Sequence, residues 1–448
     1  MERSTSVRVV VLLLVLGSVL YLGGEYRSYQ ATSGTERFET AMNQPLEERE
    51  SLVAPRNGTT VVTTQSVRAS LLEGDDGDIV AYDDAGRVLY YNGTANDYWD
   101  VDPLPGPGDR VVYVATYDDP DSAGVLNAIE TVDLATGEVR RLYTNVTDGG
   151  RWHDVDRLSP TEYAVADIAR DSVLVVNVTT GRTVWSWDAR STYPPSAGGD
   201  PDGDWSHMND VEELPDGDIL ASVRNMDQVV RIDRETGVVT NWTLGRDDAH
   251  GILDEQHNPD YIPPERGGPS LLVADSGNDR IVEYRRSDGE WERTWTYTAG
   301  LSWPRDADRL PNGHTLITDT RNDRVLEVDD DGEVTWSTTV HRPYEAERLE
   351  TGPESDGGPA VAPAGAADAG EASADGSDAR DGSAGGVSPG RILWTLLPAP
   401  LIAAVRWVLP PWMHFPEMAV LGGTTAVLAV WIGWELSLYR RALRRLGR

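Results

Sequence analysis

The chain has 448 residues, a formal net charge of −35 and no cysteine, and all 39 of its basic residues are arginine. A hydrophobic content of 39% suffices for a packed core and excludes a disordered chain. The acid excess argues against nucleic-acid binding, because phosphates need a basic face, and the lack of cysteine excludes disulfides and thiolate chemistry. The lysine-free, aspartate-rich composition favours a halophilic protein over a mesophilic one with an acidic surface, since molar salt screens such self-repulsion.

The N-terminal segment predicts a membrane anchor. Residues 9–24 carry no charge, and two arginines lie in residues 1–8. Such a run is either the core of a signal peptide or a short anchor, and no A-x-A cleavage site follows it, which favours an uncleaved anchor. The positive-inside rule assigns residues 1–8 to the cytoplasm, so residues 25–58 are expected to be an extracytoplasmic linker.

The C-terminal third predicts a spacer and a second anchor. Residues 351–390 are mostly Gly, Ala, Asp, Ser, Pro and Glu, a composition typical of a flexible, disordered linker. Residues 391–412 are apolar but interrupted by prolines, which fits an interfacial or re-entrant segment better than a full span. Residues 417–438 are expected to form a transmembrane helix, and the arginine-rich residues 439–448 a cytoplasmic tail. The middle of the chain is therefore expected on the outer side of a cell membrane.

Five N-x-[ST] triplets lie in this outer region and are candidate glycosylation sites. They begin at Asn57, Asn92, Asn145, Asn177 and Asn241. Such triplets are common by chance, so they only support the outward placement.

A repeat of about fifty residues fills the middle of the chain. An Asp-Val or similar pair, two residues and a leucine precede a Gly/Pro turn and a β-rich run. This motif begins at Asp100, Asp154, Asp210 and Asp306, at spacings of 54, 56 and 96 residues. A second marker, typified by Asn-Asp-Arg-Val, and a two-residue Thr-Gly or Asp-Gly turn keep step with it. Four short strands per repeat is the pattern of a β-propeller.

We therefore expect an all-β fold, a six-bladed β-propeller over residues 59–350, flanked by N- and C-terminal transmembrane helices. Residues Tyr344–Leu349 look like the opening strand of a further repeat that has no body after it. We expect this strand to complete the first blade, whose other strands are predicted between Ser70 and Asn92. Such closure ties the ends of the ring together and removes exposed strand edges.

Three histidines recur at blade spacing. His153 directly precedes Asp154, His207 lies three residues before Asp210, and His257 follows 50 residues later. Equivalent positions on the first strands of a propeller face its axis, so the three imidazoles are expected to converge. Arg224 could add a guanidinium that grips an oxyanion. Two alternatives stay open: the histidines cap strands within the channel, or they bind a metal such as Zn²⁺.

A family resemblance rests on these motifs. Trp205-x-His207-x-Asn209-Asp210, followed by Leu-Pro-Asp-Gly-Asp-Ile-Leu and Ser-x-Arg, resembles the arylsulfotransferase (aryl-sulfate sulfotransferase) family. Gln256-His257 and the following Leu-Leu-Val-Ala-Asp-Ser-Gly-Asn resemble that family's nucleophile blade. The similarity covers roughly residues 150–340, and the acidic composition and predicted anchors suggest a haloarchaeal-type, membrane-anchored member.

The resemblance implies a six-bladed propeller outside the cytoplasmic membrane that moves a sulfuryl group from an aryl sulfate ester to a phenol or other hydroxyl acceptor, without a nucleotide donor. It implies His257 as the nucleophile that forms a sulfohistidine, and His153, His207 and Arg224 as a sulfate clamp. Neither a cofactor nor a metal is expected. The expected partners are the aryl sulfate donor, the hydroxyl acceptor and the lipid bilayer. Residues expected to contact the substrate are Trp152, Trp205, Asn209 and Trp303.

The chain also departs from the family. Residues 25–58 leave no room for the extra N-terminal β domain of bacterial members, and their disulfide cannot form here. Pro304 or Arg305 stands where another repeat has a histidine. Two other functions remain open: a sulfate ester hydrolase that uses the same histidines, and a non-catalytic binding propeller of the NHL type, in which Asn-Asp-Arg-Val repeats also occur.

Overall fold

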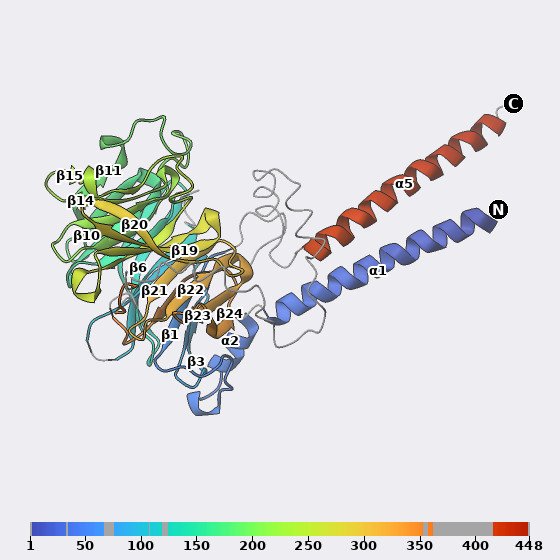
Figure 1. Cartoon of the computed structure of the whole chain (residues 1–448). Coiled ribbons are helices and arrows are strands. Elements are labelled where there is room, and N and C mark those ends of the chain that lie inside the picture. The colour runs from blue at the N-terminus through green and yellow to red at the C-terminus, as the bar shows by residue number, and fades with distance from the viewer. Residues whose placement is uncertain are drawn as a thin grey trace. The chain divides into compact units, whose positions relative to one another are not determined.

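The computed structural model describes residues 2–32, 35–66, 76–106, 108–118, 124–352, 357–361 and 415–446. They fall into two compact units, which are described separately (Figure 1). One unit comprises residues 1–34, 67–74 and 378–448, and the other comprises residues 35–66 and 75–377.

The second unit is a β-propeller of six antiparallel blades, which confirms the predicted fold. In order from the axis outward, blade one holds β25 (Pro343–Arg348), β1 (Thr60–Thr64), β2 (Ile79–Tyr82) and β3 (Val88–Asn92). Blade two holds β4 (Asp97–Pro103), β5 (Arg110–Asp118), β6 (Val125–Asp133) and β7 (Glu138–Thr147). Blade three holds β8 (Trp152–Arg157), β9 (Glu162–Asp167), β10 (Ser172–Asn177) and β11 (Arg182–Asp188).

The other three blades follow the same order. Blade four holds β12 (Met208–Glu213), β13 (Ile219–Val223), β14 (Gln228–Asp233), β15 (Gly237–Val238) and β16 (Leu244–Gly245). Blade five holds β17 (His257–Ile262), β18 (Ser270–Asp275), β19 (Arg280–Ser287) and β20 (Glu290–Tyr297). Blade six holds β21 (Pro304–Arg309), β22 (Thr315–Asp319), β23 (Arg324–Val328) and β24 (Val334–Thr339).

The innermost strands form a ring, in which β25, β4, β8, β12, β17 and β21 each contact the next and β21 returns to β25. Between neighbouring blades lie clusters of fully buried Val, Ile, Leu and Ala side chains, such as Val173 of blade three and Val230 of blade four. Burying each Val, Ile or Leu side chain contributes about 1.5–3 kcal/mol, so the inter-blade contacts hold the axial positions firmly.

The ring closes as predicted, through the strand from the end of the repeat region. β25 pairs antiparallel with β1, and Glu345 lies opposite Thr63, which in turn lies opposite Ile79. The prediction placed the other strands of this blade between Ser70 and Asn92; the structure moves β1 upstream of Ser70, to Thr60–Thr64. A run of Val and Thr gave no repeat marker by which to find it.

The recurring turn residues of the sequence have a backbone reason. Four blades follow their second strand with a 3₁₀ turn that ends on an aspartate in the left-handed region, at φ of 51–52°. These residues are Asp171, Asp227, Asp279 and Asp323. Asp is one of the few residues that tolerate this conformation, and each of these carboxylates accepts from a backbone N–H in the segment that leads to the next blade. Glycine takes the left-handed conformation in the later two-residue turns.

Two segments outside the blades pack on the propeller. The helix α2 (Thr35–Met42) lies within the region expected to be a linker and buries Phe38, whose ring lies 5.3 Å from that of Tyr91. In the region expected to be a spacer, Ala360 donates its backbone N–H to the carbonyl of Arg266 at 2.9 Å. Most of residues 351–390 and all of residues 391–412 lie outside the described residues.

The other unit contains two long apolar helices, α1 (Glu2–Thr32) and α5 (Phe415–Leu446) (Figure 1). Val7–Gly24 and Glu417–Arg440 are long and apolar enough to cross a membrane. α5 continues through most of the predicted basic tail.

Candidate functional site

A β-bulge recurs in the innermost strand of every blade. The register of β8 shifts between Trp152 and Asp154, that of β12 between Met208 and Asp210, and that of β21 between Pro304 and Asp306. The pairing register also shifts at the equivalent place in β4, β17 and β25. A bulge leaves a residue unpaired in the ladder and re-aims its side chain. The residues at these bulges are His153, Asn209, Arg305, Tyr344, Trp99 with Asp100, and Asn258 with Pro259.

The bulges and the turns before them bring together six side chains that we call the axial cluster: Trp99, His153, His207, His257, Arg305 and Tyr344. The His153 ring stacks on Trp99 with centroids 4.1 Å apart and meets the His207 ring edge-on at 5.1 Å. Tyr344 lies between histidines, with ring centroids 5.6 Å from His153 and 6.3 Å from His257. The three histidines predicted from blade spacing thus converge on the axis of the ring.

His257 is held in one orientation and keeps one nitrogen free. Its Nδ1 lies 2.8 Å from Ser276 Oγ and 3.0 Å from the carbonyl oxygen of Glu255. Its Nε2 is buried and has no hydrogen-bond partner among the described residues. Burial, and then the positive charge of Arg305, hold the pKa of His257 well below its usual value of 6.5. A neutral imidazole that donates from Nδ1 to the Glu255 carbonyl presents the lone pair of Nε2 to an electrophile.

His207 is paired with a carboxylate that sequence reasoning missed. Its Nδ1 lies 2.6 Å from Asp204 Oδ2, and Arg224 Nη2 lies 3.6 Å from the same oxygen. Burial, and next the Arg224 charge, lower the pKa of His207 to about 4, although Asp204 opposes that shift. Arg224 starts the 3₁₀ turn that directly follows β13. Asp204, three residues before His207, gave no signal because it lies in an acid-rich loop.

The backbone at the site is unusual for residues that carry a Cβ. His207, Trp303 and Arg342 each stand three residues before the bulge-side acid of their blade, and each has a positive φ, between 42° and 54°. Such conformations cost about 1–3 kcal/mol each, persist only where the surroundings enforce them, and cluster at functional sites. All three residues lie just before the innermost strand of their blade, which indicates that the functional site lies at this end of the innermost strands.

Arg305 and Tyr344 belong to the cluster although neither was predicted for it. The Arg305 guanidinium lies over the Tyr344 ring, 5.0 Å from its centroid, and donates to Gln65 Oε1 at 2.5 Å. Burial lowers the pKa of Arg305 to about 9, so it is still cationic at neutral pH. The Tyr344 hydroxyl lies 3.4 Å from His153 Nδ1. The signal was present in the sequence, because both residues directly precede the repeat acid, as His153 does.

The residues predicted to contact substrate lie in different environments. Trp152 and Trp205 are 0% and 1% exposed and lie in the cores between blades, so the structure does not support them as substrate walls. Asn209 is fully buried and donates to the Gln256 carbonyl at 2.8 Å, which positions the strand that carries His257. Trp303 does reach the site, with its ring 6.3 Å from that of His257.

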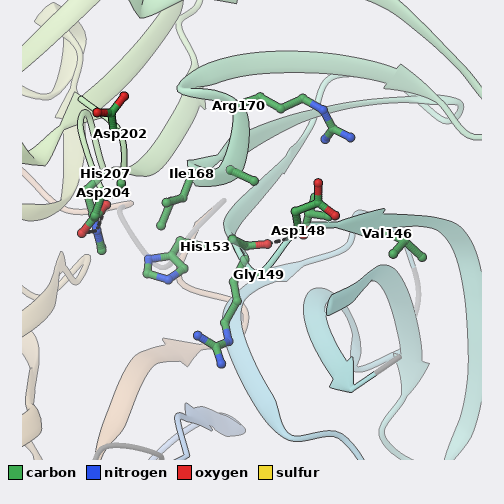
Figure 2. Close-up of a pocket in the computed structure, with 14 residues that line it drawn as sticks. Val146, Asp148, Gly149, His153, Ile168, Arg170, Asp202, Asp204 and His207 are labelled. Carbon is green, nitrogen blue, oxygen red and sulfur yellow. Dashed lines mark hydrogen bonds and ion pairs between the residues drawn. The ribbon is translucent and has the colours of Figure 1, made fainter. Parts of the chain in front are cut away.

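A pocket of about 610 Å³ opens beside the axial cluster (Figure 2). Its lining includes His153, His207, Asp204 and Arg170. Figure 2 shows the His153 and His207 rings at its wall and Asp204 beside His207. His257 is 0% exposed and Arg224 does not line the pocket, so the pocket leads toward the cluster from the side of His153 and His207.

The candidate glycosylation sites differ in accessibility. Asn57 and Asn241 are exposed, whereas Asn92, Asn145 and Asn177 are half-buried. The Asn177 side chain accepts from the Thr180 backbone N–H at 3.0 Å and so caps a turn.

Two groups among the described residues have the spacing of metal ligands, and neither contains a histidine of the axial cluster. They are Asp227 with His250 and Asp254, and Asp100 with Asp102 and Glu345.

Comparison with known proteins supports one family. Residues 156–256 match the family model described as Arylsulfotransferase (ASST), a segment that includes His207 and Arg224 and ends just before His257. No curated protein matches the chain.

Solved structures similar to the chain have low sequence identities and low TM-scores. A protein of unknown function from Bacteroides caccae is 13% identical at a TM-score of 0.44, over 65% of this chain and 98% of that one. A putative 6-phosphogluconolactonase from Bacteroides uniformis is 14% identical at 0.44, over 65% and 99%. A virginiamycin B lyase from Staphylococcus aureus is 12% identical at 0.37, over 55% and 71%.

Proposed function

We propose that this protein transfers a sulfuryl group from an aryl sulfate ester to a phenol or another hydroxyl acceptor, through a sulfohistidine at His257. The observation that carries the proposal is the convergence of His153, His207 and His257 from three consecutive blades. Burial lowers the pKa of each of them, and the nearby charges of Arg224 and Arg305 lower it further. The arylsulfotransferase family match supports the same chemistry.

In the first step, the lone pair of His257 Nε2 attacks the sulfur of the donor. The nitrogen–sulfur bond forms, the bond from sulfur to the aryl oxygen breaks, and the aryl oxide leaves with that electron pair. The imidazole stays bonded through Nδ1 to the Glu255 carbonyl and Ser276. Negative charge grows on the aryl oxygen and stays on the sulfonyl oxygens, where the Arg224 and Arg305 guanidiniums and the remaining imidazoles stabilise it.

In the second step, the acceptor hydroxyl oxygen attacks sulfur, and the sulfur–nitrogen bond breaks. His207 takes the acceptor proton, because Asp204 at 2.6 Å stabilises the imidazolium that forms. The aryl oxide recovers a proton from His207 or solvent, and His257 returns to its free state. The donor would enter by the pocket at His153 and His207, and because His257 is 0% exposed, side chains between them must shift to admit it.

The predicted setting is the outer side of a cell membrane. The two apolar helices support anchoring, and the arginines that flank them favour cytoplasmic termini. The excess of acidic residues is consistent with a halophilic host.

The test uses 4-nitrophenyl sulfate as the donor. We expect nitrophenolate release that requires an added phenol, and we expect His257→Gln to lower the rate by roughly 1,000-fold or more. His250→Gln, at an exposed histidine of the neighbouring loop, serves as the matched control and retains activity. If nitrophenolate is released without a phenol, the protein is a sulfate ester hydrolase instead. A folded His257→Gln variant that matches the wild-type rate would leave a binding propeller as the better account.

A further inference from the structure

A ring of carboxylates lies directly next to the axial cluster in sequence and in space. Each innermost strand contributes one buried acid, at the residue that completes its bulge. This carboxylate ring consists of Asp100, Asp154, Asp210, Asp260, Asp306 and Glu345. Side chains two residues apart on a strand share a face, so three further buried acids lie on the same face as the ring. They are Asp102, Asp308 and Glu347.

Part of this ring has a structural role that uses one oxygen of each carboxylate. Asp100 Oδ2 accepts from the backbone N–H of Val155 in the next blade at 3.1 Å, and Asp154 Oδ2 likewise accepts from Val211 at 2.7 Å. These bonds link neighbouring innermost strands around the axis. Among the described residues, no arginine or histidine forms an ion pair with Asp100 or Glu345.

The spacing of three of these acids fits a hard cation. Asp100, Asp102 and Glu345 each offer an oxygen, and these oxygens all lie within 4.8 Å of one another. Calcium binds oxygen at roughly 2.3–2.6 Å, so two ligands on opposite sides of one ion are roughly 4.6–5.2 Å apart. The three carboxylates are therefore close enough to share one Ca²⁺.

A buried amide that contacts one of these carboxylates has an oxygen without a partner. Asn258 is 6% exposed, and its Nδ2 donates to Glu345 Oε2 at 3.2 Å, which fixes the amide against the carboxylate group. Its Oδ1 is buried and has no hydrogen-bond partner among the described residues. A buried amide oxygen that stays unpaired is unfavourable, and a cation bound beside Glu345 would satisfy it.

We propose that Asp100, Asp102 and Glu345, together with Asn258 Oδ1, form a calcium site on the propeller axis, next to the histidine cluster. The ion would bridge β4 of blade two and β25, the strand that closes the ring. It would also fix Trp99 and Tyr344, which directly precede two of its ligands. The Trp99 ring stacks on His153, and the Tyr344 ring meets His153 edge-on. The site goes beyond the proposed transfer reaction, in which the ion takes no part.

The test is binding of Ca²⁺ and of its luminescent substitute Tb³⁺ to the purified full-length chain after treatment with a chelator. Trp99 and Tyr344 adjoin the ligands, so excitation of these rings should sensitise Tb³⁺ emission, and Ca²⁺ should quench it by competition. We expect one ion per chain at this site. Asp100→Asn and Glu345→Gln should each weaken its binding by about tenfold or more, since affinity follows the number of charged ligands.

The matched control is Asp254→Asn, which removes a carboxylate from the other candidate group, formed with Asp227 and His250. This variant should keep the sensitised emission. Emission lost in Asp254→Asn and retained in Asp100→Asn would overturn the proposal, as would a folded wild-type chain that binds neither ion. If the Glu345→Gln variant does not fold, Asp100→Asn and the wild-type titration still decide. Neither outcome depends on sulfuryl transfer, so the two proposals fail separately.

Discussion

The protonation state of His257 decides whether it can act as a nucleophile. In water an imidazole is partly protonated at neutral pH, and the protonated form has no lone pair to offer. Burial against Arg305 holds the pKa of His257 well below 6.5, and His207 falls to about 4. Both groups are therefore neutral over the physiological range, which suits attack by one and proton acceptance by the other.

The rate of nitrophenolate release should consequently be insensitive to the usual histidine pKa. A histidine with a depressed pKa loses its neutral form only when the pH falls through that lower value. We expect kcat/KM to stay level from about pH 8 to below pH 6 and to fall toward about pH 4. Circular dichroism in the same buffers separates titration from acid unfolding. A folded enzyme whose rate halves near pH 6.5 would contradict the assignment of these pKa values.

Asp204 should act through His207. Its carboxylate fixes the ring at 2.6 Å and opposes the lowering of its pKa. We expect Asp204→Asn to reduce kcat by about 100-fold, the usual contribution of a positioned acid–base group, with little change in stability. Asp202→Asn is the control, because Asp202 is an exposed carboxylate of the same pocket (Figure 2). Equal rates for the two variants would remove Asp204 from the mechanism.

At the scale of the strand, the sequence predicted the blades better than the site. Repeat acids such as Asp154 and turns such as Asp-Gly mark strand ends, so six blades and the closing strand followed from spacing. Trp99, Arg305 and Tyr344 were not predicted as site residues. The prediction considered histidines only and did not compare the residues that directly precede each repeat acid. Trp152 and Trp205 are buried between blades, and the sequence alone does not distinguish a tryptophan that faces the axis from one that packs between blades. β1 carries no marker and was placed too late.

The closing strand should be essential to the fold. The Ala346 N–H donates to Asp306 Oδ2 at 3.0 Å, and the residue pairs with Val62 of β1. Ala346→Pro removes that donor and crowds the ladder, so we expect a loss of about 3 kcal/mol or more in the free energy of unfolding. Val334→Pro, at the 50%-exposed start of the outermost strand β24, should cost far less. Urea unfolding followed by tryptophan fluorescence measures both, and similar midpoints would argue against ring closure by β25.

At the scale of the whole molecule, the terminal helices pair with each other. Arg8 donates to Glu435 at 2.6 and 2.7 Å, Ser18 lies 2.6 Å from Thr424, and Tyr21 donates to Glu417 at 2.7 Å. The residue numbers rise along α1 as they fall along α5, so the helices are antiparallel. Their free ends therefore lie together, which is the arrangement expected if both termini lie on one side of a membrane.

This topology can be tested cleanly because the chain has no cysteine. A single cysteine at position 4 or 447 should react with a membrane-impermeant maleimide only after cells are permeabilised. One in place of Thr136, an exposed turn residue of blade two, should react on intact cells. Labelling of both terminal positions on intact cells, or protection of the Thr136 position, would reverse the predicted orientation.

The most direct measurement of the central claim is the covalent intermediate itself. The chain is incubated with 4-nitrophenyl sulfate and no acceptor, digested at alkaline pH to preserve a sulfur–nitrogen bond, and analysed by mass spectrometry. We predict the added mass of one SO₃ group on the peptide that contains His257, its disappearance when a phenol is added, and its absence from His257→Gln. An active chain that carries no SO₃ on His257, or that carries it on another residue, would contradict transfer through this histidine.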